Sequence, residues 1–307
     1  MKPANLQTKI FLDSGDPGET RAIIKLLGFL DGQTTNPTLI SKNPRAKEKL
    51  DKGEKFTKEE IFGFYKDVVT EISGSIPNGS VSVEVYADKN TTAEQMLKQG
   101  REMFSWIPGA HIKFPTTHEG LTAAEQAVKE GMAVNMTLCF SQEQAAAVYS
   151  ATLRLASARS GQAHSYRQEG LSGFKNVFVS PFIGRLDDRG ENGMNLIENI
   201  VRMYEKGDHH AEVLTASVRN IDHLLCAIKL QSDIITAPFK VLKEWGEKGM
   251  PMPDQTFKYD SSNLKPISYQ EINLNKPWQE YNIKHELTNI GIEKFSGDWN
   301  SLINSTF

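Results

Sequence analysis

Residues 110–115 have the sequence AHIKFP, a short run of β-forming residues that carries one lysine, Lys113, and ends in a proline. Alternate side chains of a strand share a face, so Lys113 lies on the same side as His111 and opposite to Ile112. Burial of an unpaired ammonium costs more than a strand gains, which favours an exposed edge strand or a solvated lysine. The competing hypothesis is a buried amine that stays neutral and attacks a carbonyl to form a Schiff base. The other segments of the chain help to decide between the two.

Short β-rich runs alternate with segments of helical period from Lys9 onward, which predicts a parallel sheet with helical crossovers. We expect eight strands, at residues 9–13, 30–34, 81–87, 110–115, 133–140, 176–180, 212–216 and 233–236. Eight such units in a chain of 307 residues favour an α/β fold of the closed (β/α)8 TIM barrel type over an open doubly wound sheet. Periodicity alone does not show closure, so the open sheet remains the alternative.

Helix starts are marked by capping residues that accept hydrogen bonds from free backbone N–H groups. Asp16 and Asn36 each precede a proline, the pattern of an N-cap followed by a first-turn proline. Capping-box spacing predicts three more starts, at the pairs Thr91/Glu94, Thr116/Glu119 and Ser141/Gln144. The long segment between residues 43 and 78 has helical period around residues 58–72, so we expect additional helical structure there.

Two stretches exceed what a minimal barrel needs. Residues 158–175 lengthen the connection between the fifth and sixth strands, and no further βα unit follows Trp245. Residues 249–253 have the composition of a linker, and a helix is expected around residues 280–291. We therefore divide the chain into a barrel, residues 1–248, and a C-terminal arm, residues 249–307, that packs on the barrel. Association into a homo-oligomer stays open.

The composition excludes several classes of function. A formal net charge of −3 offers no basic surface for nucleic acid. The first apolar run, residues 10–12, is too short for a signal peptide, and no run reaches the length of a membrane span. The two cysteines, Cys139 and Cys226, form no CxxC pair and suit a reducing compartment. We expect a cytoplasmic globular protein that binds neither nucleic acid nor membranes.

Polar side chains occur in, or directly after, strands that are otherwise apolar. Catalytic groups of a TIM barrel lie at the C-terminal ends of its strands, so these polar residues are the candidates for a site. They are Asp13, Asn36, Glu84, Lys113, Asn135, Thr137, Ser180, Arg185, Ser217 and Arg219.

Each candidate also has a structural explanation. Asn36 or Ser217 could only cap a helix, and Lys113 could form a purely structural ion pair with Glu84. Arg185 could pair with an aspartate that follows it on a solvated loop. These explanations suffice one by one, but they account poorly for acids, amides, hydroxyls, guanidiniums and an amine that all gather at one mouth.

This set of groups allows imine chemistry. A neutral Lys113 amine adds to a ketone, and Glu84 moves protons during the loss of water, through a water molecule held by Thr137. The protonated imine then accepts the electrons of the adjacent carbon–carbon bond, while Asp13 removes the hydroxyl proton of the leaving carbon. Two arginines and a serine suit a phosphate, and no metal or other cofactor is required. Burial favours the neutral amine and an ionised Glu84 opposes it, so the protonation state of Lys113 stays open.

Six motifs, in order along the chain, resemble those of the transaldolase family. They are residues 11–13 (FLD), 34–40 (TTNPTLI), 112–115 (IKFP), 135–138 (NMTL), 180–185 (SPFIGR) and 216–220 (ASVRN). The resemblance implies transfer of a dihydroxyacetone unit from a ketose phosphate to an aldose phosphate in the pentose phosphate pathway. Sedoheptulose 7-phosphate or fructose 6-phosphate would be the donor, so sugar phosphates are the expected partners.

The resemblance also implies roles for individual residues. Lys113 would be the Schiff-base lysine and Asp13 the acid–base group, with Glu84 and Thr137 as the pair that handles water. Seven residues would hold the substrate, the first three through sugar hydroxyls and the last three through phosphate: Asn36, Asn135, Ser180, Phe182, Arg185, Ser217 and Arg219.

Two alternative functions remain. Fructose-6-phosphate aldolases of the same superfamily release free dihydroxyacetone, and they typically carry tyrosine at the place of Phe182 and glutamine at the place of Glu84. Both residues of this chain therefore favour a transaldolase. A barrel that binds sugar phosphate without turnover would be expected to lack the lysine or a carboxylate, and both are present here.

Overall fold

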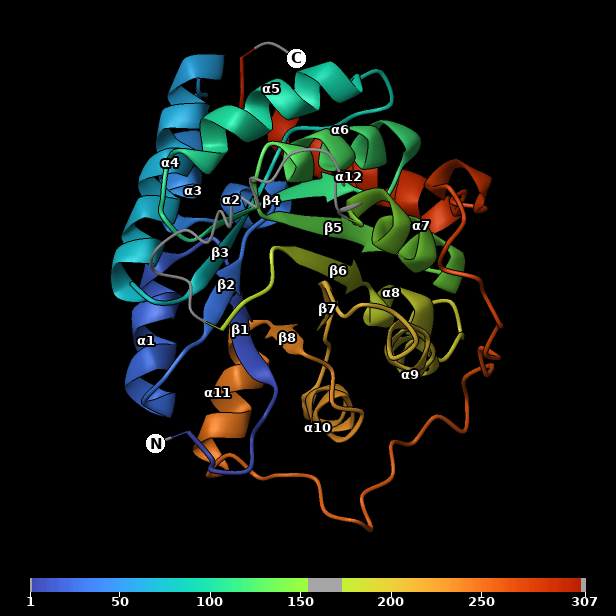
Figure 1. The fold of residues 1–307 in the computed structure, drawn as a ribbon. Coiled ribbons are helices and arrows are strands. Elements are labelled where there is room, and N and C mark those ends of the chain that lie inside the picture. Colours follow the sequence, from blue (N-terminus) through green and yellow to red (C-terminus); the bar gives the residue numbers. More distant parts are fainter. Residues whose placement is uncertain (1, 154–172, 305–307) are drawn as a thin grey trace.

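The computed structural model describes residues 2–153 and 173–304, and its core is a closed barrel of eight parallel strands in sequence order (Figure 1). The strands are β1 (Lys9–Asp13), β2 (Gly32–Thr34), β3 (Ser80–Glu84), β4 (Ala110–Pro115), β5 (Val134–Cys139), β6 (Val177–Pro181), β7 (Ala211–Thr215) and β8 (Ile234–Ala237). Because β1 pairs with β8, the barrel closes and no strand is left as an edge. The predicted (β/α)8 barrel is confirmed, and β4 is not an edge strand.

Helices follow the strands and surround the barrel. They are α1 (Pro17–Leu27), α2 (Pro37–Ser41), α3 (Pro44–Asp51), α4 (Lys58–Ser75), α5 (Ala93–Phe104), α6 (His118–Lys129), α7 (Gln142–Thr152), α8 (Ile183–Asp187), α9 (Gly193–Tyr204), α10 (Ile221–Lys229), α11 (Phe239–Glu247) and α12 (Glu286–Ser301), with a 3₁₀ turn, η1, at Trp278–Glu280. The helical structure expected near residues 58–72 is α4. None of these helices is long and apolar enough to cross a membrane.

Three of the predicted helix caps are correct. Asp16, Asn36 and Ser141 each accept a hydrogen bond from a backbone N–H in the first turn of the helix that follows. The predicted caps of α5 and α6 are wrong by one residue, since Thr92 and Thr117 fill those positions.

Both displaced caps have the same cause, which is competition for the hydroxyl group. Thr91 donates to Asp88, and Thr116 donates to the Thr137 carbonyl, so neither hydroxyl serves its helix. Strand β3 also ends earlier than expected, because the backbone N–H of Tyr86 bonds to the Gln99 side chain and leaves the ladder.

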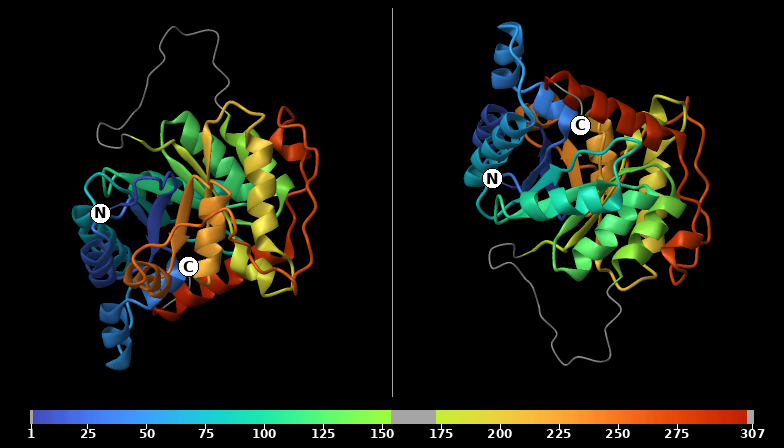
Figure 2. Two further views of the ribbon diagram at one scale, coloured as in Figure 1. Left: turned by 90° about the horizontal axis from the view of Figure 1, so that it is seen from below. Right: turned by 90° about the horizontal axis from the view of Figure 1, so that it is seen from above.

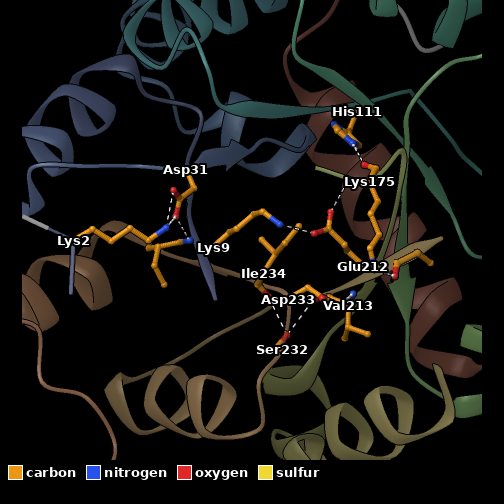
Figure 3. A network of polar contacts seen from close by, with 12 residues as sticks. Lys2, Lys9, Asp31, His111, Lys175, Glu212, Val213, Ser232, Asp233 and Ile234 are labelled. Carbon is orange, nitrogen blue, oxygen red and sulfur yellow. Dashed lines mark hydrogen bonds and ion pairs between the residues drawn. The ribbon is translucent and has the colours of Figure 1, made fainter. Parts of the chain in front are cut away.

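The N-terminal end of the barrel is filled by a network of paired charges (Figure 3). Lys9 Nζ donates to Glu212 at 2.5 Å, and the other oxygen of Glu212 accepts the Lys175 N–H at 2.9 Å. The Lys175 carbonyl accepts a hydrogen bond of 3.0 Å from His111 Nε2, so the ring proton lies on Nε2 and Nδ1 accepts from Ser80. Every charge here has a partner, and the network closes the end of the barrel opposite the strand C-termini.

The C-terminal arm returns to the barrel and ends in α12. Figure 2 shows this helix in red beside the blue segment that contains α2, and it also contacts β5. The helix expected around residues 280–291 begins later, at Glu286, and the His285 side chain accepts the backbone N–H of Leu287 in its first turn. The long connection at residues 158–175 lies largely outside the described residues. Where the barrel ends and the arm begins as separate domains stays a prediction.

Candidate active site

A cavity of about 550 Å³ opens at the C-terminal ends of the barrel strands. Its wall includes eight of the residues predicted from the sequence: Asp13, Asn36, Lys113, Ser180, Phe182, Arg185, Ser217 and Arg219. The other three, Glu84, Asn135 and Thr137, are buried on β3 and β5, the strands that flank β4. The fold therefore brings all the predicted residues to one end of the barrel.

Lys113 lies on β4 with 3% of its surface exposed. Its Nζ atom is 2.9 Å from Glu84 Oε2 and donates a hydrogen bond of 3.1 Å to the Thr35 carbonyl. The contact with Glu84 has the distance of an ion pair but not the angles of a hydrogen bond, so Glu84 Oε2 has no hydrogen-bond partner among the described residues. Burial raises the pKa of Glu84, and the charge of Lys113 offsets this only in part. A carboxylate with a raised pKa can take the proton of the lysine and leave a neutral amine.

Two residues that the sequence did not single out support this pair. The Tyr65 hydroxyl accepts the backbone N–H of Glu84 at 2.9 Å and lies 2.6 Å from the Thr35 hydroxyl. Because Thr35 donates its own proton to the Ser82 carbonyl, Tyr65 must donate to Thr35. Tyr65 comes from α4, so that the helical segment after β2 fixes the end of β3.

Asp13 ends β1 on the cavity wall, and its Oδ1 atom accepts a hydrogen bond of 2.7 Å from Thr34. Burial raises the pKa of Asp13, while Lys113 and the Thr34 bond lower it by less. A carboxylate in this state is a stronger base than one in water. Asp13 can therefore remove a hydroxyl proton from a molecule bound above Lys113.

Asn135 belongs to a chain of hydrogen bonds across three strands. Its amide nitrogen donates to Ser82 at 3.0 Å, and its amide oxygen accepts from Ser180 at 2.6 Å. The register places Asn135 beside Lys113 on the neighbouring strand. These two bonds hold the Asn135 side chain in place, and Ser180 lies on the cavity wall.

Thr137 differs from these residues because its buried hydroxyl has no hydrogen-bond partner among the described residues. An unpaired buried hydroxyl costs about 1–3 kcal/mol, so its retention on an interior strand needs a reason. Glu84 Oε2 likewise has no hydrogen bond from the described residues. Glu84 lies opposite Lys113 in the register of β3 and β4, and Thr137 lies opposite Pro115 in that of β4 and β5.

Cationic groups cluster on the other wall of the cavity. Arg185, on α8, makes no hydrogen bond or ion pair with the described residues, and its buried Nη1 atom is unpartnered. Burial and the nearby charge of Arg219 lower the pKa of Arg185, which stays charged in proteins. Arg219 is exposed and donates to Asp188 at 2.7 Å. Ser217 lies beside them with φ of 62°, a conformation that residues other than glycine rarely adopt.

Of the purely structural explanations for these residues, the one for Asn36 holds and those for Ser217 and Arg185 do not. Asn36 does cap α2, but its amide nitrogen makes no hydrogen bond with the described residues. Ser217 is not a cap, because Asn220 fills that position for α10. The ion pair of Asp188 is made by Arg219 and not by Arg185.

The cavity wall includes residues that sequence reasoning missed. Leu287, Ile290, Lys294 and Phe295 come from α12 at the far end of the chain, and Lys42 follows α2. No motif marked them, since ordinary amphipathic helices contain such residues.

The comparisons with known proteins show the family of this chain. The model of the family Transaldolase/Fructose-6-phosphate aldolase matches residues 10–306. The chain belongs to this family. It is 33% identical over 294 residues to a probable transaldolase of Dehalococcoides mccartyi, which covers 96% of this chain and 99% of that one. It is 32% identical to a probable transaldolase of Caulobacter sp., over 95% of this chain and 96% of that one.

A more distant likeness is to a solved 3-hexulose-6-phosphate synthase of Salmonella typhimurium, with a TM-score of 0.45 and 10% identity over 78% of this chain and 97% of that one. The protein is an enzyme of the transaldolase kind, with an aldolase-type function. The predicted family resemblance is confirmed.

Proposed function

We propose that this transaldolase transfers a dihydroxyacetone unit from a ketose phosphate to an aldose phosphate through a Schiff base on Lys113. The observation that carries the proposal is the buried Nζ atom of Lys113, 2.9 Å from Glu84, at a cavity with Asp13 on its wall and two arginines at its rim. If Lys113 served only to form an ion pair, it would not need to lie at a cavity.

The first step is formation of the imine. The Lys113 amine attacks the C2 carbonyl of the ketose, and the carbinolamine loses water to give a protonated imine. Glu84 first takes the lysine proton and then returns a proton to the leaving hydroxyl. Glu84 Oε2 and the Thr137 hydroxyl have no hydrogen bond from the described residues, which supports a water between them that carries these protons.

The second step breaks the C3–C4 bond. Asp13 removes the proton of the C4 hydroxyl, the C3–C4 electrons move into the imine, and the aldose phosphate leaves as an aldehyde. The enamine of dihydroxyacetone remains on Lys113. Asn36, Asn135 and Ser180 hold its hydroxyls, and the hydrogen bonds of Asn135 to Ser82 and Ser180 keep its side chain in place. An acceptor aldose then reverses these steps.

Phosphate binds at Arg185, Ser217 and Arg219. The absence of any ion pair for Arg185 among the described residues supports this assignment, since its N–H groups stay available for an anion. Sedoheptulose 7-phosphate and fructose 6-phosphate are the donors we propose, in the pentose phosphate pathway. The two free, buried cysteines suit a cytoplasmic location.

Reduction with borohydride in the presence of fructose 6-phosphate tests the proposal. We expect a dihydroxyacetone-sized adduct on the peptide that contains Lys113 and none in the Lys113→Met variant. Lys9, a partly buried lysine that also pairs with a glutamate, is the internal control and should stay unmodified. A folded wild-type protein that binds sugar phosphate but forms no adduct at Lys113 would contradict the mechanism.

The aldolase that releases free dihydroxyacetone is the second candidate. Glu84 and Phe182 favour the transferase, because the resemblance associates glutamine and tyrosine at these places with the aldolase. Substantial dihydroxyacetone release without acceptor, at the rate seen with acceptor, would establish the aldolase instead.

A further inference from the structure

The Arg185 guanidinium lies between two aromatic rings. Its central carbon is 5.3 Å from the centroid of Phe182, which follows β6, and 5.3 Å from the centroid of Phe295, on α12. Rings hold a planar guanidinium through its faces and leave its N–H groups in the plane free. A carboxylate would instead occupy those donors and neutralise the charge. The two rings thus orient an arginine for an anion without competing with it.

A glycine of α12 provides the space for this arrangement. A Cβ atom at Gly291 would lie 2.7 Å from Arg185 Nη1 and 2.5 Å from Leu138 Cδ2. Both neighbours are ends of flexible side chains, so a methyl group there displaces the guanidinium more readily than the backbone. The same Nη1 atom is the one that is buried without a hydrogen-bond partner among the described residues.

Contacts at several points fix α12 against the barrel. The Thr288 hydroxyl donates to the Leu138 carbonyl at 2.9 Å, and Asp298 accepts from the hydroxyl of Thr38 in α2. At the C-terminal end, the Leu302 carbonyl accepts the Phe56 N–H at 2.9 Å. The position of the helix relative to the cavity is therefore set, and with it the position of Phe295.

We infer that α12 is part of the phosphate site, with Phe295 and Gly291 as positioning residues that hold Arg185 in the orientation in which it binds the substrate phosphate. This inference rests on the proposed function, which makes Arg185 a phosphate ligand. Phe295 and Gly291 themselves touch no reacting atom. The C-terminal arm thereby sets how strongly the enzyme prefers phosphorylated sugars.

A pair of glycine-to-alanine variants separates positioning from helix stability. Gly291→Ala places a methyl group against Arg185, whereas Gly297→Ala, on the same helix, meets no atom within 4 Å. Both changes favour the helix by a similar amount. The readout is kcat/KM for glyceraldehyde 3-phosphate divided by kcat/KM for glyceraldehyde as acceptors, because the donor step cancels from this ratio.

We expect the ratio to fall on the order of tenfold in Gly291→Ala, as for a weakened charge-assisted hydrogen bond, and to stay unchanged in Gly297→Ala. Phe295→Leu should lower it too, while Phe257→Leu, which removes a ring under Lys229 elsewhere on the arm, should not. An unchanged ratio in both Gly291→Ala and Phe295→Leu, with a lowered ratio in Arg185→Gln, would overturn the inference.

Calorimetry with inorganic phosphate tests the inference by binding alone, without turnover. Weaker phosphate binding in Gly291→Ala than in wild type and Gly297→Ala supports the positioning role, and equal binding in all three overturns it. Failure of the proposed function has a different signature, which is the absence of a borohydride adduct on Lys113.

Discussion

Replacement of Lys113 by methionine should make the stability of the protein strongly dependent on pH. Lys113→Met keeps the length of the side chain but removes the charge that lies 2.9 Å from Glu84. Lys113 is also a charge that holds down the pKa of both Glu84 and Asp13, which burial raises. In the variant both pKa values should rise further.

The direction of this pH dependence follows from the number of protons that the folded and unfolded states bind. A carboxyl group in the unfolded chain loses its proton near pH 4, whereas a buried one with a raised pKa keeps it to higher pH. The folded state then binds more protons, so stability falls as pH rises from the unfolded to the folded pKa. The fall is about 1.4 kcal/mol for each pH unit over which one carboxyl group stays protonated only when folded. The pH range over which stability falls extends to higher pH in Lys113→Met than in wild type.

Equilibrium unfolding in urea, from about pH 5 to about pH 8, measures this effect. The gap in unfolding free energy between wild type and Lys113→Met should widen as pH rises. Lys129→Met is the control, because the exposed pair of Lys129 with Glu125 contributes at most about 1 kcal/mol. A gap that stays constant over this range would refute the coupling of Lys113 to the two carboxylates.

Two further predictions use other parts of the barrel. Glu84→Gln keeps the volume of the side chain but removes the base beside Lys113. We therefore expect kcat to fall about 10²- to 10⁴-fold with little change in the KM for the donor. A wild-type kcat in steady-state kinetics would contradict this prediction. Burial lowers the pKa of His111 to about 4, so the folded state resists protonation and stability is lost as pH falls from 6.5 towards that value. In His111→Gln the acid slope measured by urea unfolding should be flatter by about 1.4 kcal/mol per pH unit, and equal slopes would show that His111 is not responsible.

The order of strands and the position of the candidate site were predictable because both depend on local patterns. A strand buried on both faces is apolar, so one polar residue in it, such as Lys113 or Asn135, stands out and must point into the barrel. The parallel order of the strands then collects these residues at one end. None of this requires knowledge of contacts between distant segments.

The sequence could not predict which hydroxyl serves which partner or where the arm lies. Thr91 and Thr116 fit a capping-box pattern, yet in the folded chain each hydroxyl donates to another group, Asp88 or the Thr137 carbonyl, and the next threonine caps the helix. Tyr65 and Phe295 reach the site from helices outside the barrel strands. Their contacts with Glu84 and Arg185 join separate segments of the chain and leave no pattern in the local sequence. The same holds for the space at Gly291, which has meaning only beside Arg185.

The barrel contains two pairs of lysine and a buried glutamate, Lys9–Glu212 and Lys113–Glu84, and their difference explains why residue identity alone does not mark a catalytic lysine. At the N-terminal end, both carboxylate oxygens of Glu212 receive hydrogen bonds, one of them from Lys9. At the C-terminal end, Glu84 Oε2 receives none from the described residues, and the pair lies at a cavity. Groups whose hydrogen bonds are all made within the protein stabilise the barrel, whereas groups that lack one retain hydrogen-bonding capacity for a substrate. Glu84 Oε2 and Thr137 Oγ1, which have no hydrogen bond from the described residues, therefore indicate the position of the chemistry more surely than the lysine alone.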